Sequence, residues 1–108
     1  MDQSATLEPG TGDVFMLRGV LDFRTVPDLD KQSRVLFGTR KEVTVDLSGV
    51  TRANSAGLAL LMEWVQMARR GGRNFRFANI PEKLLSLARV TELDEFLPRA
   101  DAGRTAPA

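Results

Sequence analysis

The residues best suited to chemistry lie at one junction, Asn54-Ser55-Ala56-Gly57, between an apolar strand-like segment and a long helical segment. A short side-chain oxygen at such a place can accept a hydrogen bond from the free N–H groups of a helix's first turn. The positive end of the helix dipole also favours an anion or a phosphoryl group. We therefore interpret Asn54 and Ser55 as alternative N-caps, and Ser55 as a candidate partner contact and possible phosphosite.

Other residues with catalytic potential are scarce. The sequence contains no His and no Cys, which removes the commonest general base, the commonest metal ligand and every thiolate. Asp22 and Asp46 remain, and we interpret both as loop-stabilising or rim residues rather than catalytic acids. No Walker A pattern or nucleophile–base pair is visible. We expect no enzymatic activity, no cofactor and no metal site.

Composition restricts the class of protein further. The chain has 108 residues, 43% hydrophobic and 27% charged, which is typical of one globular domain. A formal charge of +1 gives no bulk attraction to nucleic acid. No apolar run reaches the roughly 18 residues of a membrane span, so we expect no direct membrane insertion. The first residues lack the basic and apolar regions of a secretory leader, and we expect a cytoplasmic protein.

The segments that position the junction alternate between strand and helix patterns. Strands are expected at 14–20, 43–47 and 74–80, helices at 26–37, 58–70 and 84–90, and a first hairpin strand is plausible at 5–8. This order predicts an α/β fold with a mixed, mainly parallel β-sheet, an N-terminal hairpin strand and flanking helices. We expect one domain over 1–98 and a disordered tail over 99–108.

Several boundaries follow from local signals. Thr25 is the expected N-cap of the first helix, while Gly38 and Gly71-Gly72 are expected to end the first two helices. A short loop is expected between the central strand and the helix that follows it. The segment 91–97 could form a turn of helix or an edge strand.

The central helix has more apolar surface than a helix packed on one side of a sheet requires. One expected stripe faces the core and consists of Leu58, Leu61, Met62, Val65 and Ala68, and a polar stripe consists of Ala59, Glu63, Gln66 and Arg70. Leu60, Trp64 and Met67 form a third face. A neighbouring helix or the C-terminal segment could cover this face. We favour an exposed docking face centred on Trp64, because Trp commonly anchors protein interfaces.

The segment Val45–Leu58 resembles the signature of STAS domains, the anti-sigma-factor-antagonist-like family. That signature is an apolar strand, Asp-Leu-Ser, a loop and then Asp-Ser/Thr-Ser/Gly-Gly-Leu. Gly19-Val20-Leu21-Asp22 is similar to the family's Gly-Glu-Leu-Asp. The resemblance extends from about Leu7 to Pro98 and implies the mixed β-sheet fold expected above.

The resemblance departs from the family's phosphorylation switch. Its anti-sigma-factor antagonists carry two adjacent hydroxyl residues before Gly-Leu, and a kinase phosphorylates the second. The matching pair is Ser55-Ala56, so Ala56 occupies the phosphoacceptor position, and Asn54 replaces the motif's Asp. Partner switching with a serine kinase or anti-sigma factor is therefore the alternative function.

A closer resemblance is to the MlaB-like branch of the family, the small STAS subunit of lipid-asymmetry ABC transporters. Ser55–Leu61 is similar to that branch's Thr-Gly-Gly-Leu-Ala-Leu-Leu, and Phe96–Arg99 is similar to its C-terminal part. This implies a non-enzymatic accessory subunit that binds the transporter ATPase and supports assembly and activity of the complex. The implied location is cytoplasmic, peripheral to the inner membrane through the partner. The expected contact residues are Asp22, Asn54, Ser55, Ala56, Gly57, Leu60, Trp64 and Met67.

Overall fold

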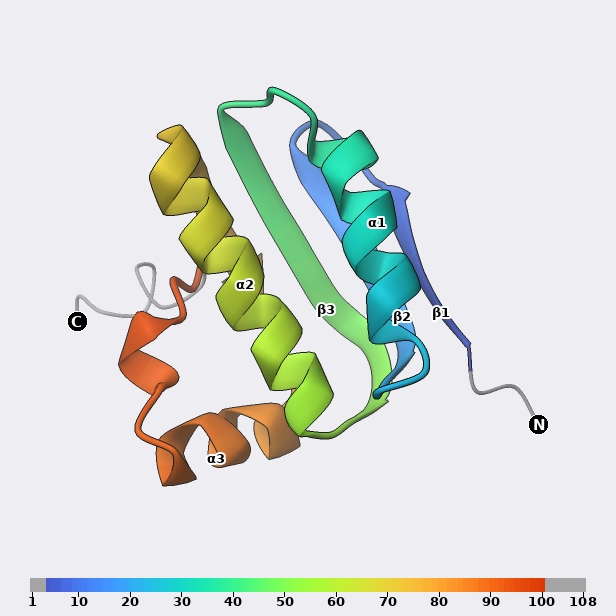
Figure 1. Ribbon diagram of the computed structural model, residues 1–108, viewed down its shortest axis with the longest axis vertical. Helices are drawn as coiled ribbons and strands as arrows, with labels where there is room; N and C mark the ends of the chain where they lie inside the picture. Colours follow the sequence, from blue (N-terminus) through green and yellow to red (C-terminus); the bar gives the residue numbers. More distant parts are fainter. Residues whose placement is uncertain (1–3, 101–108) are drawn as a thin grey trace.

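A computed structural model describes residues 4–100 and has a mixed α/β fold, as expected from the alternating pattern (Figure 1). Its elements, in chain order, are β1 (Ala5–Pro9), β2 (Val14–Leu21), α1 (Val26–Phe37), β3 (Glu42–Ala53), α2 (Ser55–Gly71), β4 (Asn74–Ala78), α3 (Glu82–Val90) and the short 3-10 helix η1 (Asp94–Phe96).

The four strands form one sheet in the order β1-β2-β3-β4. The hairpin partners β1 and β2 are antiparallel, whereas β2, β3 and β4 are parallel to one another. Each parallel strand leads into a helix, so the N-termini of α1, α2 and α3 follow the carboxyl ends of β2, β3 and β4. The carboxyl ends of parallel strands share one edge of the sheet, and this edge is where the predicted site residues begin.

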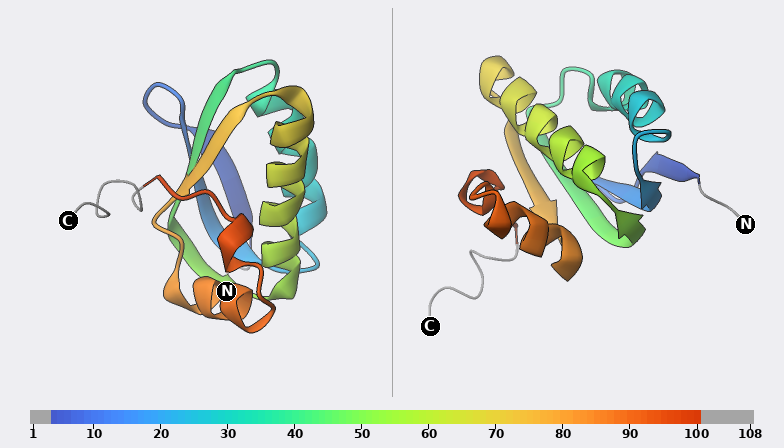
Figure 2. Two further views of the ribbon diagram at one scale, coloured as in Figure 1. Left: turned by 90° about the vertical axis from the view of Figure 1, so that its left-hand side faces the viewer. Right: turned by 60° about the horizontal axis from the view of Figure 1, so that its bottom comes forward.

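Helices α1 and α2 cover the same face of the sheet, and α3 lies beyond its carboxyl edge (Figures 1 and 2). The period-two pattern of β3 explains how the core forms, since Val43, Val45 and Leu47 are buried beneath these helices. The intervening Thr44 and Asp46 are only half-buried on the opposite face. No helix within residues 4–100 is long and apolar enough to cross a membrane.

The central strand is longer than the sequence indicated. We expected a loop after Leu47, but β3 continues to Ala53 because its second half pairs with the end of β2. This pairing runs from Arg18↔Gly49 to Leu21↔Ala53. One register shift lies just before it, between Met16 and Arg18, and one lies within it, between Gly19 and Val20, and these shifts break the simple alternation of side chains. The loop prediction is therefore wrong, and Asn54 alone separates β3 from α2.

The prediction that Leu60 and Trp64 form an exposed docking face is also wrong. Trp64 is 1% exposed and Leu60 is 3% exposed, because α1 packs against this side of α2. The Trp64 indole N–H donates a 2.9 Å hydrogen bond to Ser33 Oγ, and the Trp64 and Phe37 rings meet edge-on with centroids 5.4 Å apart. Met67, the third residue of that face, is half-buried. The alternative, a neighbouring helix covering this face, is what the structure shows.

The last part of the described chain returns to the sheet. Of the two alternatives for 91–97, the structure contains a turn of helix, η1. Beyond it, the Phe77 N–H donates to Pro98 O, and the Ala100 N–H donates to Phe77 O. These bonds make a parallel bridge between Arg99 and Phe77, so 98–100 is ordered against β4. The rest of the predicted tail, 101–108, lies outside the described residues.

Candidate interaction site at the N-terminus of α2

The N-terminus of α2 is capped by Asn54. Its side-chain Oδ1 accepts a 2.8 Å hydrogen bond from the Ala56 N–H, and its extended backbone (φ −120°, ψ −163°) suits an N-cap. The Asn54 N–H donates to Leu21 O at 3.1 Å, which attaches the cap to the end of β2. Of the two candidate caps, Asn54 is the one used.

Ser55 is the first residue of α2 and is exposed. Its hydroxyl has no hydrogen-bond partner within the described part of the chain, since Asn54 performs the capping. The hydroxyl thus lies at the positive end of a 17-residue helix without a local structural task. Such a group can donate to or accept from a partner.

Ala56 and Gly57, the next two predicted contact residues, are buried instead. A Cβ added to Gly57 would lie 2.9 Å from Leu21 Cβ and 3.3 Å from Ala53 Cβ. Glycine therefore allows the first turn of α2 to approach the ends of β2 and β3 closely. Gly57 is therefore packed against the ends of these strands rather than exposed to a partner.

Asp22 lies at the same edge, where it organises the turn between β2 and α1. Its Oδ1 accepts from the N–H groups of Arg24 (2.9 Å) and Thr25 (3.2 Å), and its Oδ2 pairs with the Arg24 guanidinium at 3.3 Å. The hydrogen bond from the Arg24 N–H is the largest influence on Asp22 and lowers its pKa. Thr25 precedes α1 as expected, but its hydroxyl donates to Val20 O rather than capping the helix.

Asp46, the second aspartate considered, lies on β3 and contacts a neighbouring loop. Burial raises the pKa of Asp46, but hydrogen bonds from the Asn79 side chain (3.1 Å) and the Ser48 N–H (2.8 Å) outweigh it and lower the pKa. The carboxylate is thus held by the residues around it. Within residues 4–100, no group of His, Cys, Asp or Glu is arranged to hold a metal ion.

The structure brings together only part of the predicted contact set. Asn54 and Ser55 are exposed at the carboxyl edge, and Asp22 is half-buried beside them. Leu60 and Trp64 belong to the core, as do Ala56 and Gly57, and Met67 lies further along α2.

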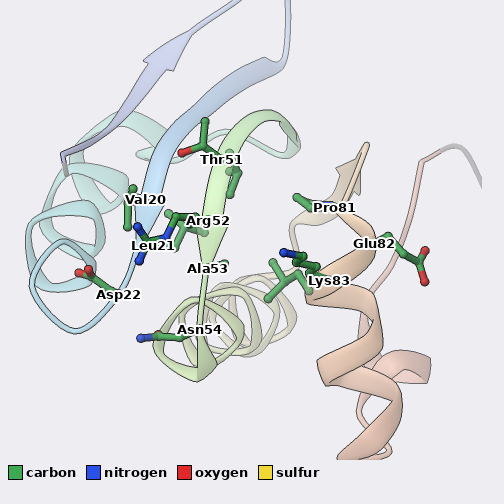
Figure 3. A pocket seen from close by; sticks show the side chains of 12 residues that line it. Val20, Leu21, Asp22, Thr51, Arg52, Ala53, Asn54, Pro81, Glu82 and Lys83 are labelled. Atoms are coloured by element: carbon green, nitrogen blue, oxygen red, sulfur yellow. The ribbon is translucent and has the colours of Figure 1, made fainter. Parts of the chain in front are cut away.

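Sequence reasoning missed three exposed residues at this edge. Phe23, next to Asp22, is 72% exposed. Arg52 and Lys83 line a cavity of about 400 Å³ that extends from β3 to the start of α3 (Figure 3). No motif marks these residues, because they are brought together only when β2, β3 and β4 end at the same edge.

Comparison with known proteins gives a consistent family. A sequence model described as "Mlab, STAS domain" matches residues 5–98. The chain is 32% identical over 91 residues to the "Intermembrane phospholipid transport system binding protein MlaB" of Escherichia coli (strain K12), covering 82% of this chain and 91% of that protein. The Shigella flexneri protein of the same name matches with the same identity and coverage.

One similar solved structure is that of the anti-sigma factor antagonist SpoIIAA in its unphosphorylated form. The TM-score is 0.66, with coverage of 96% of this chain and 99% of that chain. The sequence identity is 15%, so this likeness shows the fold alone.

Proposed function

The chain belongs to the STAS domain family, and on that premise we propose that it is a non-enzymatic accessory subunit of a bacterial phospholipid-transport ABC complex. In this role it binds the ATPase subunit and supports assembly and activity of the complex. It resides in the cytoplasm, peripheral to the inner membrane through that partner. The 32% identity to proteins named as components of an intermembrane phospholipid transport system supports this role.

The observation that carries the proposal is the free hydroxyl of Ser55. Asn54 caps α2, so the hydroxyl is exposed at the helix N-terminus and available to a partner. A buried interface around this hydroxyl would strengthen any hydrogen bond it makes there.

The apolar part of the contact comes from residues other than Trp64. Phe23 exposes 72% of its surface at the same sheet edge, and aromatic anchors dominate the energetics of many interfaces. Ala59 lies one turn along α2 from Ser55 and is also exposed, which leaves room for a close approach. We define the docking edge as Phe23, Asn54, Ser55 and Ala59.

Affinity capture of the tagged protein from its native cell extract tests this proposal. We expect an ABC ATPase in the captured fraction, identified by mass spectrometry, and its loss with Ser55→Arg. Ser86→Arg is the matched control, since it places the same bulk and charge at an exposed site on α3. Equal capture by both variants would contradict docking at this edge.

The alternative is an anti-sigma factor antagonist that works by partner switching with a serine kinase. The fold likeness to SpoIIAA is compatible with it. Against it, Ala56 has no hydroxyl and is 5% exposed, so a switch would have to use Ser55. Capture of a serine kinase, with a phosphate added at Ser55, would favour this alternative over the transporter role.

A further inference from the structure

The cavity at the carboxyl edge has apolar walls. Its volume is about 400 Å³, within the range of roughly 300–1,000 Å³ that small-molecule pockets occupy. The apolar lining comes from the end of β2, the second half of β3 and the start of α3: Val20, Leu21, Val50, Ala53, Pro81 and Leu84. None of the described residues that line the cavity has an aromatic ring, so the lining suits an aliphatic group better than a nucleobase.

The charged groups at the cavity differ in whether they are already paired. Asp22 is bonded to Arg24 and to its own turn. The Glu82 carboxylate points away from the other labelled residues in Figure 3 and pairs with Arg89 at 2.9 Å. Both acidic residues of the lining are therefore neutralised locally.

The two basic residues of the lining are free. Arg52 on β3 and Lys83 on α3 have neither an ion pair nor a side-chain hydrogen bond within residues 4–100. They come from different elements: in Figure 3 the Arg52 guanidinium lies beside Val20 and Leu21, whereas the Lys83 amine points toward β3 from the other side. The uncompensated charge around the apolar hollow is thus positive.

We propose that this cavity binds a small anionic amphiphile, in which a phosphate or carboxylate contacts Arg52 and Lys83 and an aliphatic chain fills the apolar hollow. The anion pairs with two cations that have no partner within residues 4–100, and the aliphatic chain of the ligand transfers its own apolar surface from water into the cavity. The cavity shares Asn54 with the docking edge, but the proposed ligand contacts, Arg52 and Lys83, lie outside that edge. The ligand is either a free amphiphile or the end of a membrane lipid with the same chemistry.

The test uses the whole protein, labelled with ¹⁵N, and octyl phosphate as the probe. We expect octyl phosphate to change the amide chemical shifts of residues 50–54 and 82–84. These changes should reach a plateau as the concentration of the probe rises. Inorganic phosphate tests the contribution of the charge alone, and octyl glucoside tests that of the alkyl chain alone. Each should bind at least about tenfold more weakly than octyl phosphate. Sedimentation with phosphatidic acid vesicles then distinguishes a membrane lipid from a free ligand.

Two variants make the test specific. The double variant Arg52→Gln/Lys83→Gln should weaken octyl phosphate binding about tenfold or more, because charged hydrogen bonds are lost. Lys31→Gln, which removes an exposed positive charge on α1, should leave binding unchanged.

The proposal is overturned if neither octyl phosphate nor the vesicles bind, or if the double variant binds them as wild type does. A third outcome also contradicts the proposal: octyl phosphate does not bind, and Arg52→Gln/Lys83→Gln no longer captures the protein partner from extract. The cavity would then receive a segment of that protein. ATPase capture by Ser55→Arg is measured separately, so the failure of one proposal is distinguishable from the failure of the other.

Discussion

The Trp64 indole N–H lies 2.9 Å from Ser33 Oγ, in a hydrogen bond between two fully buried side chains of α2 and α1. Ser33 in turn donates to Asp30 O at 2.7 Å, so its hydroxyl bridges the indole and the α1 backbone. This contact holds the face of α2 that carries Leu60 and Trp64 against α1, so the exposed residues of α2, Ser55 and Ala59 among them, lie on other sides of the helix.

Ser33→Ala tests this buried bond. The substitution leaves the indole N–H buried without an acceptor, and we expect it to lower the free energy of unfolding by about 1–3 kcal/mol. Urea unfolding measures the change, with the exposed Ser86→Ala expected to remain within about 0.5 kcal/mol of wild type. If Ser33→Ala changed the free energy of unfolding as little as Ser86→Ala does, the hydrogen bond between Trp64 and Ser33 would contribute little to stability.

Gly57→Ala tests the close approach of α2 to the sheet. The new methyl group would lie 2.9 Å from Leu21 Cβ, and we expect a loss of about 1–3 kcal/mol in the free energy of unfolding. Gly71→Ala is the matched control, because within residues 4–100 no atom outside its chain neighbours and its own helix backbone lies within 4 Å of the added Cβ. Being the better helix former, alanine at 71 should raise stability by up to about 1 kcal/mol. Similar effects at both positions would rule out a steric role for Gly57.

Asn54→Ala separates capping from partner contact. Loss of the bond from the Ala56 N–H should cost about 0.5–2 kcal/mol of stability, whereas Asn54→Asp keeps an acceptor and should stay near wild type. Ser55→Ala should change stability by less than about 0.5 kcal/mol, since the hydroxyl bonds to nothing in the described chain. Thermal unfolding of the three variants decides the assignment. If Ser55→Ala were the most destabilising, Ser55 would be the cap.

Asp22 gives the fold a dependence on acidic pH. Its pKa is lower in the folded protein, chiefly through the Arg24 N–H, so the unfolded chain binds a proton first as pH falls. The stability contributed by the carboxylate is present at neutral pH and is lost as pH falls from about 4 through the folded-state pKa. Denaturant unfolding should therefore give a higher free energy of unfolding for wild type than for Asp22→Asn at pH 7. This difference should become smaller below pH 4.

The sequence predicted the order and type of the main elements because their signals are local. Alternation in β3 and the stop at Gly72, which adopts a left-handed conformation (φ 69°), are both properties of short segments. The second half of β3 was missed because it is held by pairing with β2, whose register shifts hide the alternation. Pairing partners are a property of the fold rather than of the segment.

The candidate site was predicted only where its geometry is local. Asn54 and Ser55 follow from the helix start, but the burial of Trp64 depends on α1 lying beside α2. The sequence of α1 does contain a signal for the burial of Trp64. Leu29, Ser33 and Phe37 follow one another at intervals of four residues and form a buried stripe, in which Ser33 is the polar residue. A polar residue in an otherwise apolar stripe indicates a buried polar partner on a neighbouring element.

The most direct test of the ATPase contact is the dissociation constant between the purified protein and its captured ATPase, for wild type and Ser55→Ala. We predict that the loss of the hydroxyl weakens binding by roughly 3- to 10-fold while the free energy of unfolding stays within about 0.5 kcal/mol of wild type. An unchanged dissociation constant would contradict the account, because Ser55 would then lie outside the interface.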